Sequence, residues 1–314
     1  MLYINHLSFK YSEKQILTDI NFTISKGQTC ALIGESGCGK STLLKLIYGL
    51  LHVTEGKIYW GETRILGPKY NLVPGMDFIK YLAQDFDLMP YVTVAENVGK
   101  YLSNFYPEEK QQRITELLTV VDMLEFANQP TKNLSGGQMQ RVALAKALAV
   151  EPEILLLDEP FSHIDNFRKN KLRRTLFEYI KQKKITCMVA THDVNDILAF
   201  ADETIVIKNG KIMAQDTTKN IYQQTDNQYM AALFDEVNII QTKFLSIENT
   251  SQKYQICYPH QLKKVTQSNL KVSIKKSYFK GKYYLIEAFY DEGILFFEHP
   301  TELLPTEIVW LAMC

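Results

Sequence analysis

The residues best suited to chemistry form a glycine-rich run at positions 34–42, GESGCGKST. The run matches G-x-x-x-x-G-K-[ST], between a buried apolar strand pattern, TCALIG, and a helical pattern, KSTLLKLIYGL. Glycines let backbone N–H groups turn inward around phosphate oxygens, and the helix adds its positive amino end. We expect Lys40 to reach the β- and γ-phosphates and Ser41 to bind Mg²⁺. The pattern alone fits kinases, GTPases and many ATPases.

A pair of carboxylates ends a second predicted strand, in EILLLDEP at residues 153–160. Its apolar run, residues 154–157, delivers Asp158 and Glu159 to the carboxyl end, where open α/β sheets bind their ligands. We expect Asp158 to take part in holding Mg²⁺ and Glu159 to polarise an attacking water molecule. Away from a phosphate loop, an Asp-Glu pair would be an ordinary solvated turn.

Two more polar residues follow strand-like segments. His192 follows the buried strand pattern in CMVATHD, and Gln84 lies in YLAQDF. A lone histidine is usually structural, but a position after a strand of a nucleotide-binding sheet favours a role at the nucleotide. Gln84 could reach the metal or the water, whereas taken by itself it would be a surface glutamine.

A second stretch suited to anions is NLSGGQMQR, at residues 133–141. Ser135 and Gln138 form the S-x-x-Q pattern of a capping box, which predicts a helix start with outward N–H groups. Gly136 and Gly137 keep side chains away from this positive helix end. Alone, S-x-x-Q would more simply mark an ordinary capped helix.

Length and composition describe a globular protein with more than one domain. The chain has 314 residues, of which 46% are hydrophobic and 22% charged. It exceeds the size at which one hydrophobic core usually stops growing, so we expect two domains. Lys and Arg (35) balance Asp and Glu (35), which gives no electrostatic case for a nucleic-acid partner.

The sequence also indicates the compartment. The start, MLYINHLSFKYSEK, lacks the pattern of a secretory signal, and no run of eighteen apolar residues is present. We therefore expect a chain that does not span a membrane by itself. The five cysteines (Cys30, Cys38, Cys187, Cys257 and Cys314) include no CxxC pair, so we expect a reducing cytosol without disulfides or a zinc site.

The predicted elements form an α/β domain followed by a small all-β domain. Strands are expected at 2–9 and 20–24, helices dominate 86–150, with one over about 108–123, and strands return in ILLLDE, TCMVATHD and TIVIKNGKIMAQ. The helices between the first two of these predict parallel crossovers, and Asn209-Gly210 predicts a hairpin turn. Period-2 patterning takes over after about residue 234. We assign domains to 1–234, with a helical subdomain at about 86–150, and to 235–314.

With these residues assembled, positions 1 to about 230 resemble the ATP-binding subunit of ABC transporters, a P-loop NTPase fold. The most specific motif is LSGGQ, at 134–138. The resemblance implies ATP and Mg²⁺ as cofactors, a catalytic role for Gln84, Glu159 and His192, and metal binding by Ser41, Gln84 and Asp158. It also places Tyr11, which would otherwise be ordinary strand packing, against adenine. The predicted nucleotide contacts within one chain are Tyr11, Gly34, Glu35, Ser36, Gly37, Cys38, Gly39, Lys40, Ser41, Thr42 and Asp158.

The resemblance further implies a head-to-tail homodimer whose closure drives transport. Ser135, Gly136, Gly137, Gln138 and Asp165 would then serve the nucleotide of the opposite subunit. FDLMPYVTVAENV resembles the region that receives a coupling helix of an integral membrane permease, which places the chain at the cytoplasmic face of the membrane. The segment FSHID (161–165) is the D-loop, where a histidine stands in place of the usual alanine. Because every catalytic position is retained, an inactive, purely binding cassette is disfavoured.

Residues 238–314 resemble the small transport-associated OB-type (TOBE) barrel of importer subunits, in YQICYPHQL and KVSIKKSYFKGKYYLIEA. Importers of ferric iron, polyamine, sulfate, molybdate and thiamine type share such tails, and the sequence does not select among them. A solute-binding protein is implied as an indirect partner. An exporter-type ABC ATPase and a soluble ABC ATPase without a transport role stay open as alternatives.

Overall fold

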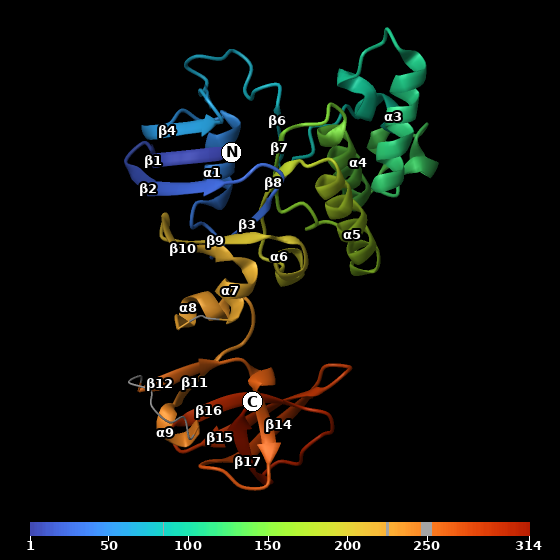
Figure 1. Cartoon of the computed structure of the whole chain (residues 1–314). Helices are drawn as coiled ribbons and strands as arrows, with labels where there is room; N and C mark the ends of the chain where they lie inside the picture. Colours follow the sequence, from blue (N-terminus) through green and yellow to red (C-terminus); the bar gives the residue numbers. More distant parts are fainter. Residues whose placement is uncertain (84, 224–225, 246–252) are drawn as a thin grey trace. The chain divides into compact units, whose positions relative to one another are not determined.

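The computed structural model describes residues 1–83, 85–223, 226–245 and 253–314. The chain divides into two compact units, Met1–Lys219 and Asn220–Cys314 (Figure 1). The α/β fold followed by a small β unit is confirmed. The division into domains at 234/235 stays a prediction.

The first unit begins with an antiparallel sheet in the order β2-β1-β4-β5. Its strands are β1 (Leu2–Tyr11), β2 (Lys14–Ile24), β4 (Glu55–Trp60) and β5 (Thr63–Arg64). The first two strands extend beyond the predicted 2–9 and 20–24 because their ladder continues to the tight turn, where Tyr11 pairs with Lys14. Alternate side chains of the sheet are buried, as in Leu2 and Ile4, so that one face packs on the core.

The central sheet has the order β10-β9-β3-β8-β7-β6. It is built from β3 (Thr29–Ile33), β6 (Ile79–Leu82), β7 (Ile154–Asp158), β8 (Thr186–Ala190), β9 (Glu203–Lys208) and β10 (Lys211–Thr217). The pairs from β9 through β6 are parallel, as predicted for β7 and β8. Every residue of β3, β7 and β8 is buried, as expected for parallel strands covered on both faces.

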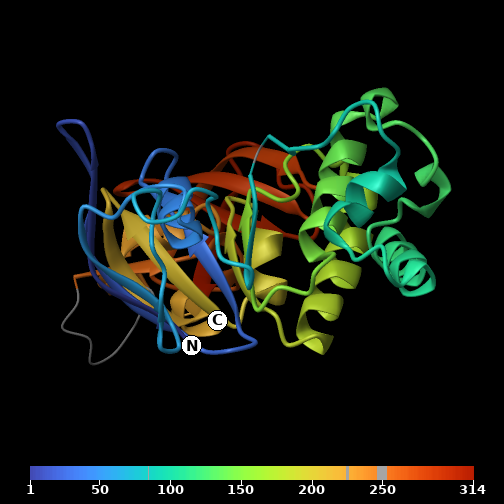
Figure 2. The ribbon, with the colours of Figure 1, turned by 90° about the horizontal axis from the view of Figure 1, so that it is seen from above.

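The two faces of this sheet pack against different hydrophobic cores. Leu156 and Met188 belong to the core shared with helix α1 (Lys40–Tyr48) and the antiparallel sheet. Leu155 and Leu157 belong to the core shared with the helical part of the unit. Helices α3, α4 and α5 gather on that side of the sheet in both views (Figures 1 and 2).

The helical part of the first unit contains α2 (Val94–Val98), η1 (Gly99–Tyr101), α3 (Pro107–Val120), η2 (Leu124–Phe126), η3 (Thr131–Asn133), α4 (Gly136–Leu148), α5 (Asn166–Gln182) and α6 (Val194–Phe200). The predicted capping boxes at Thr93 and Ser135 are confirmed. The helix expected to reach residue 123 ends at Val120, because Asp122 takes a left-handed φ of 56°.

The second unit is mainly β-structure. After α7 (Thr218–Gln223), which crosses the boundary, come α8 (Gln228–Ala232), β11 (Asn238–Gln241), α9 (Thr242–Leu245), β12 (Tyr254–Cys257), η4 (Pro259–Gln261), β13 (Leu262–Val265), β14 (Leu270–Phe279), β15 (Tyr284–Tyr290), β16 (Gly293–His299) and β17 (Ile308–Met313). A five-stranded antiparallel sheet, β13-β17-β14-β15-β16, surrounds a core centred on residues such as Phe297 and Ile286.

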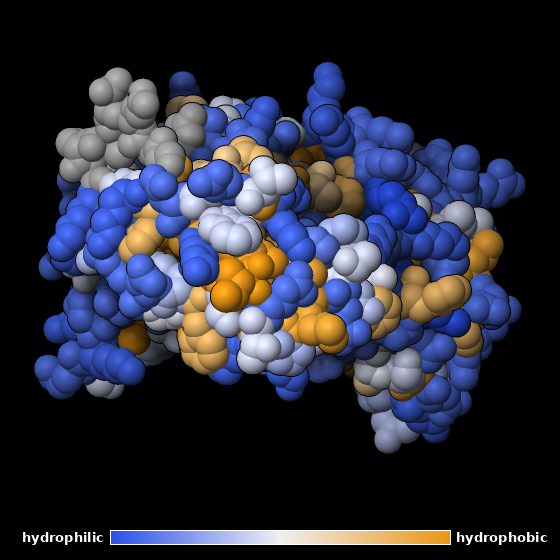
Figure 3. Space-filling view, turned by 90° about the horizontal axis from the view of Figure 1, so that it is seen from below, coloured by the Kyte–Doolittle hydropathy of each residue, from blue (hydrophilic) through white to orange (hydrophobic). Residues whose placement is uncertain are grey.

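Figure 3 shows hydrophobic side chains gathered near the middle of one face, with hydrophilic ones around them. Among the helices in the described ranges, none is long and apolar enough to cross a membrane.

The hairpin that joins β9 to β10 packs directly on β2. Its turn residues, Asn209 and Gly210, take φ angles of 50° and 72°, which confirms the predicted two-residue turn. The carbonyl of Gly210 accepts a hydrogen bond from the Thr18 N–H at 2.8 Å. A Cβ at Gly210 would lie 2.0 Å from the Ile16 carbonyl oxygen, so a larger residue does not fit.

We predict that Gly210→Ala lowers the free energy of unfolding by at least about 3 kcal/mol, because it adds a backbone clash to left-handed strain. Gly61→Ala is the matched control: its φ is also positive, at 58°, but a Cβ there meets no described atom within 4 Å. The control should lose only about 1 kcal/mol. Urea denaturation in a Trp310→Phe background, with Trp60 as the fluorescent reporter, measures both. Equal losses would contradict the packing of the hairpin on β2.

Candidate functional site

The candidate site is assembled at one edge of the central sheet by the register of three parallel strands. Leu32 of β3 pairs with Ala190 of β8, and Ala190 also pairs with Asp158 of β7. The loops that follow these strands therefore begin side by side. The Glu159 N–H extends the contact by donating to the Ala190 carbonyl at 2.9 Å.

The loop after β3 takes the shape that the glycine pattern predicts. Gly37 and Gly39 take positive φ angles of 80° and 112°. The Lys40 ammonium donates to the carbonyls of Gly34 at 2.7 Å and Glu35 at 3.0 Å. Because Gly39 has no side chain to cap helix α1, the first N–H groups of that helix remain suited to a phosphate.

Ser41 and Asp158 meet beside this loop, as predicted for a magnesium site. The Ser41 hydroxyl donates to Asp158 Oδ1 at 3.0 Å. A cavity of about 320 Å³ is lined by Ile16, Ser36, Gly37, Gly39, Lys40, Ser41, Thr42, Asp158 and Glu159. Hydroxyl and carboxylate oxygens beside a phosphate cavity are the donors that Mg²⁺ takes, so the residues fit this ion. Gln84, the third predicted metal ligand, lies outside the described residues.

A tyrosine that the sequence reasoning missed also contacts this carboxylate. Tyr81, in β6, donates from its hydroxyl to Asp158 Oδ2 at 3.2 Å. Burial, followed by the charge of Asp158 and this hydrogen bond, raises the pKa of the Tyr81 phenol well above its usual value. The hydroxyl therefore keeps its proton and acts as a donor. No local sequence signal marked Tyr81, because only the pairing of β6 with β7 brings it to Asp158.

Glu159 and His192 lie together at the same edge. His192 Nδ1 is 2.9 Å from Glu159 Oε1. Glu159 has a left-handed φ of 51°, an unfavourable conformation for a residue with a side chain. Its carbonyl accepts hydrogen bonds from Gln140 Nε2 at 3.0 Å and the Ser162 hydroxyl at 3.1 Å. The strained turn is thus held from two sides.

The segment that carries His192 is anchored by a buried arginine, another residue that the sequence reasoning missed. The Arg173 guanidinium on α5 donates to the carboxylates of Asp193 and Asp196. Thr191 Oγ1 donates to Asp196 Oδ2 at 2.9 Å. Burial raises the pKa of Asp196 to about 6, although Arg173 and Thr191 favour its charged form. These contacts fix the backbone on both sides of His192.

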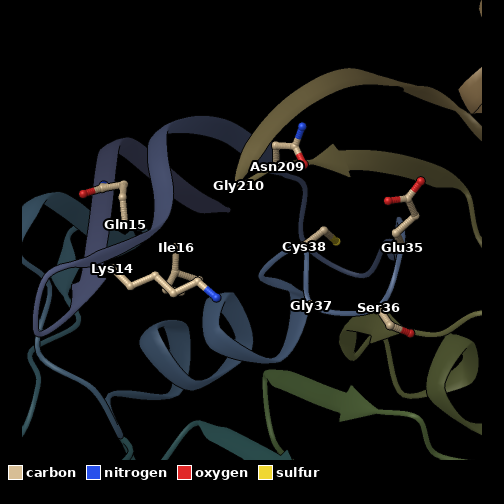
Figure 4. Close-up of a pocket in the computed structure, with 9 residues that line it drawn as sticks. All are labelled: Lys14, Gln15, Ile16, Glu35, Ser36, Gly37, Cys38, Asn209 and Gly210. Carbon is tan, nitrogen blue, oxygen red and sulfur yellow. The ribbon is translucent and has the colours of Figure 1, made fainter.

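The phosphate cavity continues toward the turn between β1 and β2. A pocket of about 300 Å³ shares Ile16, Ser36 and Gly37 with it. Figure 4 shows Lys14, Gln15 and Ile16 on one side of this pocket and the loop that carries Glu35 and Cys38 on the other. Tyr11 ends β1 nearby with 44% of its surface exposed, and its ring packs edge-on against Phe9. An exposed ring is what stacking on adenine requires.

Helix α4 begins with the capping box that the sequence pattern predicts. Ser135 Oγ accepts from the Gln138 N–H at 3.3 Å, and Gln138 Oε1 accepts from the Ser135 N–H at 2.8 Å. A Cβ at Gly136 would meet no described atom within 4 Å, whereas one at Gly137 would lie 2.7 Å from the His163 carbonyl oxygen. A side chain would therefore fit at Gly136 but not at Gly137, where it would meet the D-loop of the same chain.

The predicted site residues divide into two groups in the single chain. Residues 36–42, Asp158, Glu159 and His192 come together at the sheet edge. Among the described residues that line the phosphate cavity, none belongs to the signature 135–138. Asp165 caps α5, accepting from the Arg168 N–H at 3.0 Å, and does not line the cavity either. The catalytic and binding roles of all these residues stay predictions.

Known proteins resemble this chain in both sequence and structure. The family model described as ABC transporter matches residues 17–162. A Fe(3+) ions import ATP-binding protein, FbpC, of Haemophilus influenzae is 33% identical over 281 residues, which covers 89% of this chain and 80% of the relative. The FbpC of Fusobacterium nucleatum is 32% identical over 279 residues, which covers 88% of this chain and 74% of the relative.

Two solved structures share the fold of the first unit. One is the dimeric ATP-binding cassette MJ0796 in a post-hydrolysis state with ADP and Pi, with a TM-score of 0.62 and 31% identity over 69% of this chain and 99% of that one. The other is cbiO1 of Clostridium perfringens, part of an ABC transporter complex, with a TM-score of 0.62 and 29% identity. The match covers 70% of this chain and 89% of cbiO1. The chain therefore belongs to the ABC transporter family, as an importer-type ATP-binding subunit that hydrolyses ATP.

Proposed function

We propose that two copies of this chain bind ATP between them, so that each nucleotide contacts the phosphate loop of one copy and the signature of the other. The observation that carries this proposal is the division of the site. The bare amino end of α4 is suited to an anion, yet its residues do not line the phosphate cavity of their own chain in the part that the structure describes. A second copy supplies the missing half.

Within this pair, each group has a distinct task. Lys40 and the N–H groups of residues 37–41 bind the β- and γ-phosphates. Ser41 and Asp158 would hold Mg²⁺, which supplies positive charge to the phosphate oxygens when it is bound. Glu159 accepts a proton from the attacking water, and His192, 2.9 Å from Glu159, orients that carboxylate. Ser135, Gly136 and Gly137 of the second copy close the site over the γ-phosphate.

The pair works on a membrane permease at the cytoplasmic face. A pocket of about 420 Å³ between β6 and α4, whose walls include Phe86, Asp87 and Lys146, offers a seat for a coupling segment. Lys146 Nζ lies 3.0 Å from Asp87 Oδ2 and fixes one wall. The names of the relatives support Fe(3+) as the imported solute. A solute-binding protein would be an indirect partner of the permease. Residues 235–314 form the TOBE-type domain.

Purification of the full chain from solubilised membranes tests the transport role. It should recover an integral membrane protein, and the reconstituted complex should hydrolyse ATP faster with a Fe(3+)-loaded binding protein than with the empty one. Recovery only with ribosomes or DNA would overturn the transport role. Stimulation only by a binding protein loaded with another solute would overturn the proposal that Fe(3+) is the imported solute.

The role of Glu159 gives a first prediction. Glu159→Gln keeps the shape of the side chain but removes its charge and basicity, so ATP hydrolysis should fall at least about a hundredfold while ATP still binds. Glu153→Gln, at the opposite end of β7, is the matched control and should hydrolyse ATP near the wild-type rate. Phosphate release and ATP binding are measured on both. Undiminished hydrolysis in Glu159→Gln would refute the assignment.

The role of the signature gives a second prediction. Gly136→Asp fits the open space of the single chain, so the variant should fold and bind ATP. The new carboxylate would repel the γ-phosphate held by the partner, so ATP-dependent dimerisation should be lost and hydrolysis should fall at least about a hundredfold. Gly136→Asn adds a side chain of the same size without the charge, so it should retain more dimerisation and more hydrolysis than Gly136→Asp. Loss of ATP binding by the isolated Gly136→Asp chain would contradict the two-chain site.

A further inference from the structure

We propose that Tyr81 is a positioning residue for the magnesium site: its hydroxyl holds the Asp158 carboxylate in the orientation that binds Mg²⁺. The inference rests on the proposed role of Asp158 and goes beyond it, since the phosphate loop and the acidic pair contain no tyrosine.

The two oxygens of Asp158 are held by different partners. Oδ1 accepts the Ser41 hydroxyl at 3.0 Å, and Oδ2 accepts the Tyr81 hydroxyl at 3.2 Å. Asp158 is 4% exposed and ends β7, so its backbone is already fixed by the sheet. The remaining freedom is rotation of the carboxylate. Hydrogen bonds to both oxygens prevent that rotation. In other metal sites, residues that hydrogen-bond to a metal ligand orient the ligand in the same way.

The position of Tyr81 is fixed independently of Asp158. Tyr81 pairs with Leu156 in the parallel ladder between β6 and β7. Its ring packs against Tyr48, with ring centroids 5.5 Å apart, and both tyrosines line the pocket of about 420 Å³. The aromatic ring is thus held by packing while its hydroxyl reaches the carboxylate. A phenol hydroxyl that faces a carboxylate oxygen can only donate to it, so the direction of the hydrogen bond is set.

This geometry also links two regions of the first unit. The same side chain touches Asp158 with its hydroxyl and forms part of the pocket wall with its ring. A change in packing at the wall therefore reaches the carboxylate through one residue.

The test measures magnesium binding without turnover. In a Glu159→Gln background with saturating ATP, the thermal unfolding midpoint is followed as free Mg²⁺ is raised, because bound Mg²⁺ stabilises the folded chain. Tyr81→Phe removes the hydroxyl and keeps the ring, so the Mg²⁺ concentration at half-effect should rise about fivefold to tenfold. The affinity for ATP without Mg²⁺ should not change. Tyr81→Met, which also lacks the hydroxyl, should shift the Mg²⁺ dependence in the same direction.

Tyr48→Phe is the matched control, since it removes a hydroxyl from the same pocket wall and keeps the ring contact with Tyr81. Its Mg²⁺ dependence should equal that of the parent. An unchanged Mg²⁺ dependence in Tyr81→Phe, or an equal shift in Tyr48→Phe, would overturn the inference. Asp158→Asn tests the underlying assignment: if it binds Mg²⁺ like the parent, the proposed metal site is wrong and the inference is lost with it.

Discussion

The structure depends first on the register of three parallel strands. β8 lies between β3 and β7, and its last residue, Ala190, is paired with Leu32 on one side and Asp158 on the other. A slip by one residue would turn every side chain of a strand to the other face of the sheet. Here it would also separate the phosphate loop from the carboxylates. β7 is packed on both faces, since it contributes Leu155 and Leu157 to one core and Leu156 to the other.

The structure depends second on the link between helix α4 and the turn that carries Glu159. Gln140 donates from Nε2 to the Glu159 carbonyl at 3.0 Å and accepts the His163 N–H at its Oε1 at 3.1 Å. Gln140 is buried, so this link is shielded from water. The helix whose amino end we propose to serve a second subunit thus also supports the strained backbone of its own Glu159. If a nucleotide binds at that helix end as we propose, Gln140 links its binding site to the backbone of Glu159.

Features set by local physics could be predicted from the sequence. The glycine loop, the capping boxes at Thr93 and Ser135 and the Asn209-Gly210 turn each depend on residues within a few positions of one another. The buried strands could be predicted because their apolar runs are continuous. The approach of Asp158 to Ser41 followed from the rule that ligands bind at the carboxyl ends of parallel strands.

Contacts that need the tertiary structure could not be predicted. Tyr81 is one aromatic residue in an ordinary strand pattern, and only the pairing of β6 with β7 brings its hydroxyl to Asp158. Arg173 and Asp196 are separated by a strand and a turn, so their contact depends on how α5 packs on the sheet. The end of α3 at Val120 depends on the left-handed Asp122, which no periodicity reveals.

The central claim, that each ATP site is shared by two chains, is tested most directly by mixing two defective chains. In a Glu159→Gln background, one chain carries Lys40→Ala and the other Gly136→Asp, so each lacks a different half of the site. Sedimentation with ATP should show monomers for either chain alone and dimers for the mixture, because the mixed pair has one complete site. Monomers in the mixture, with unmutated Glu159→Gln chains dimerising under the same conditions, would contradict the account.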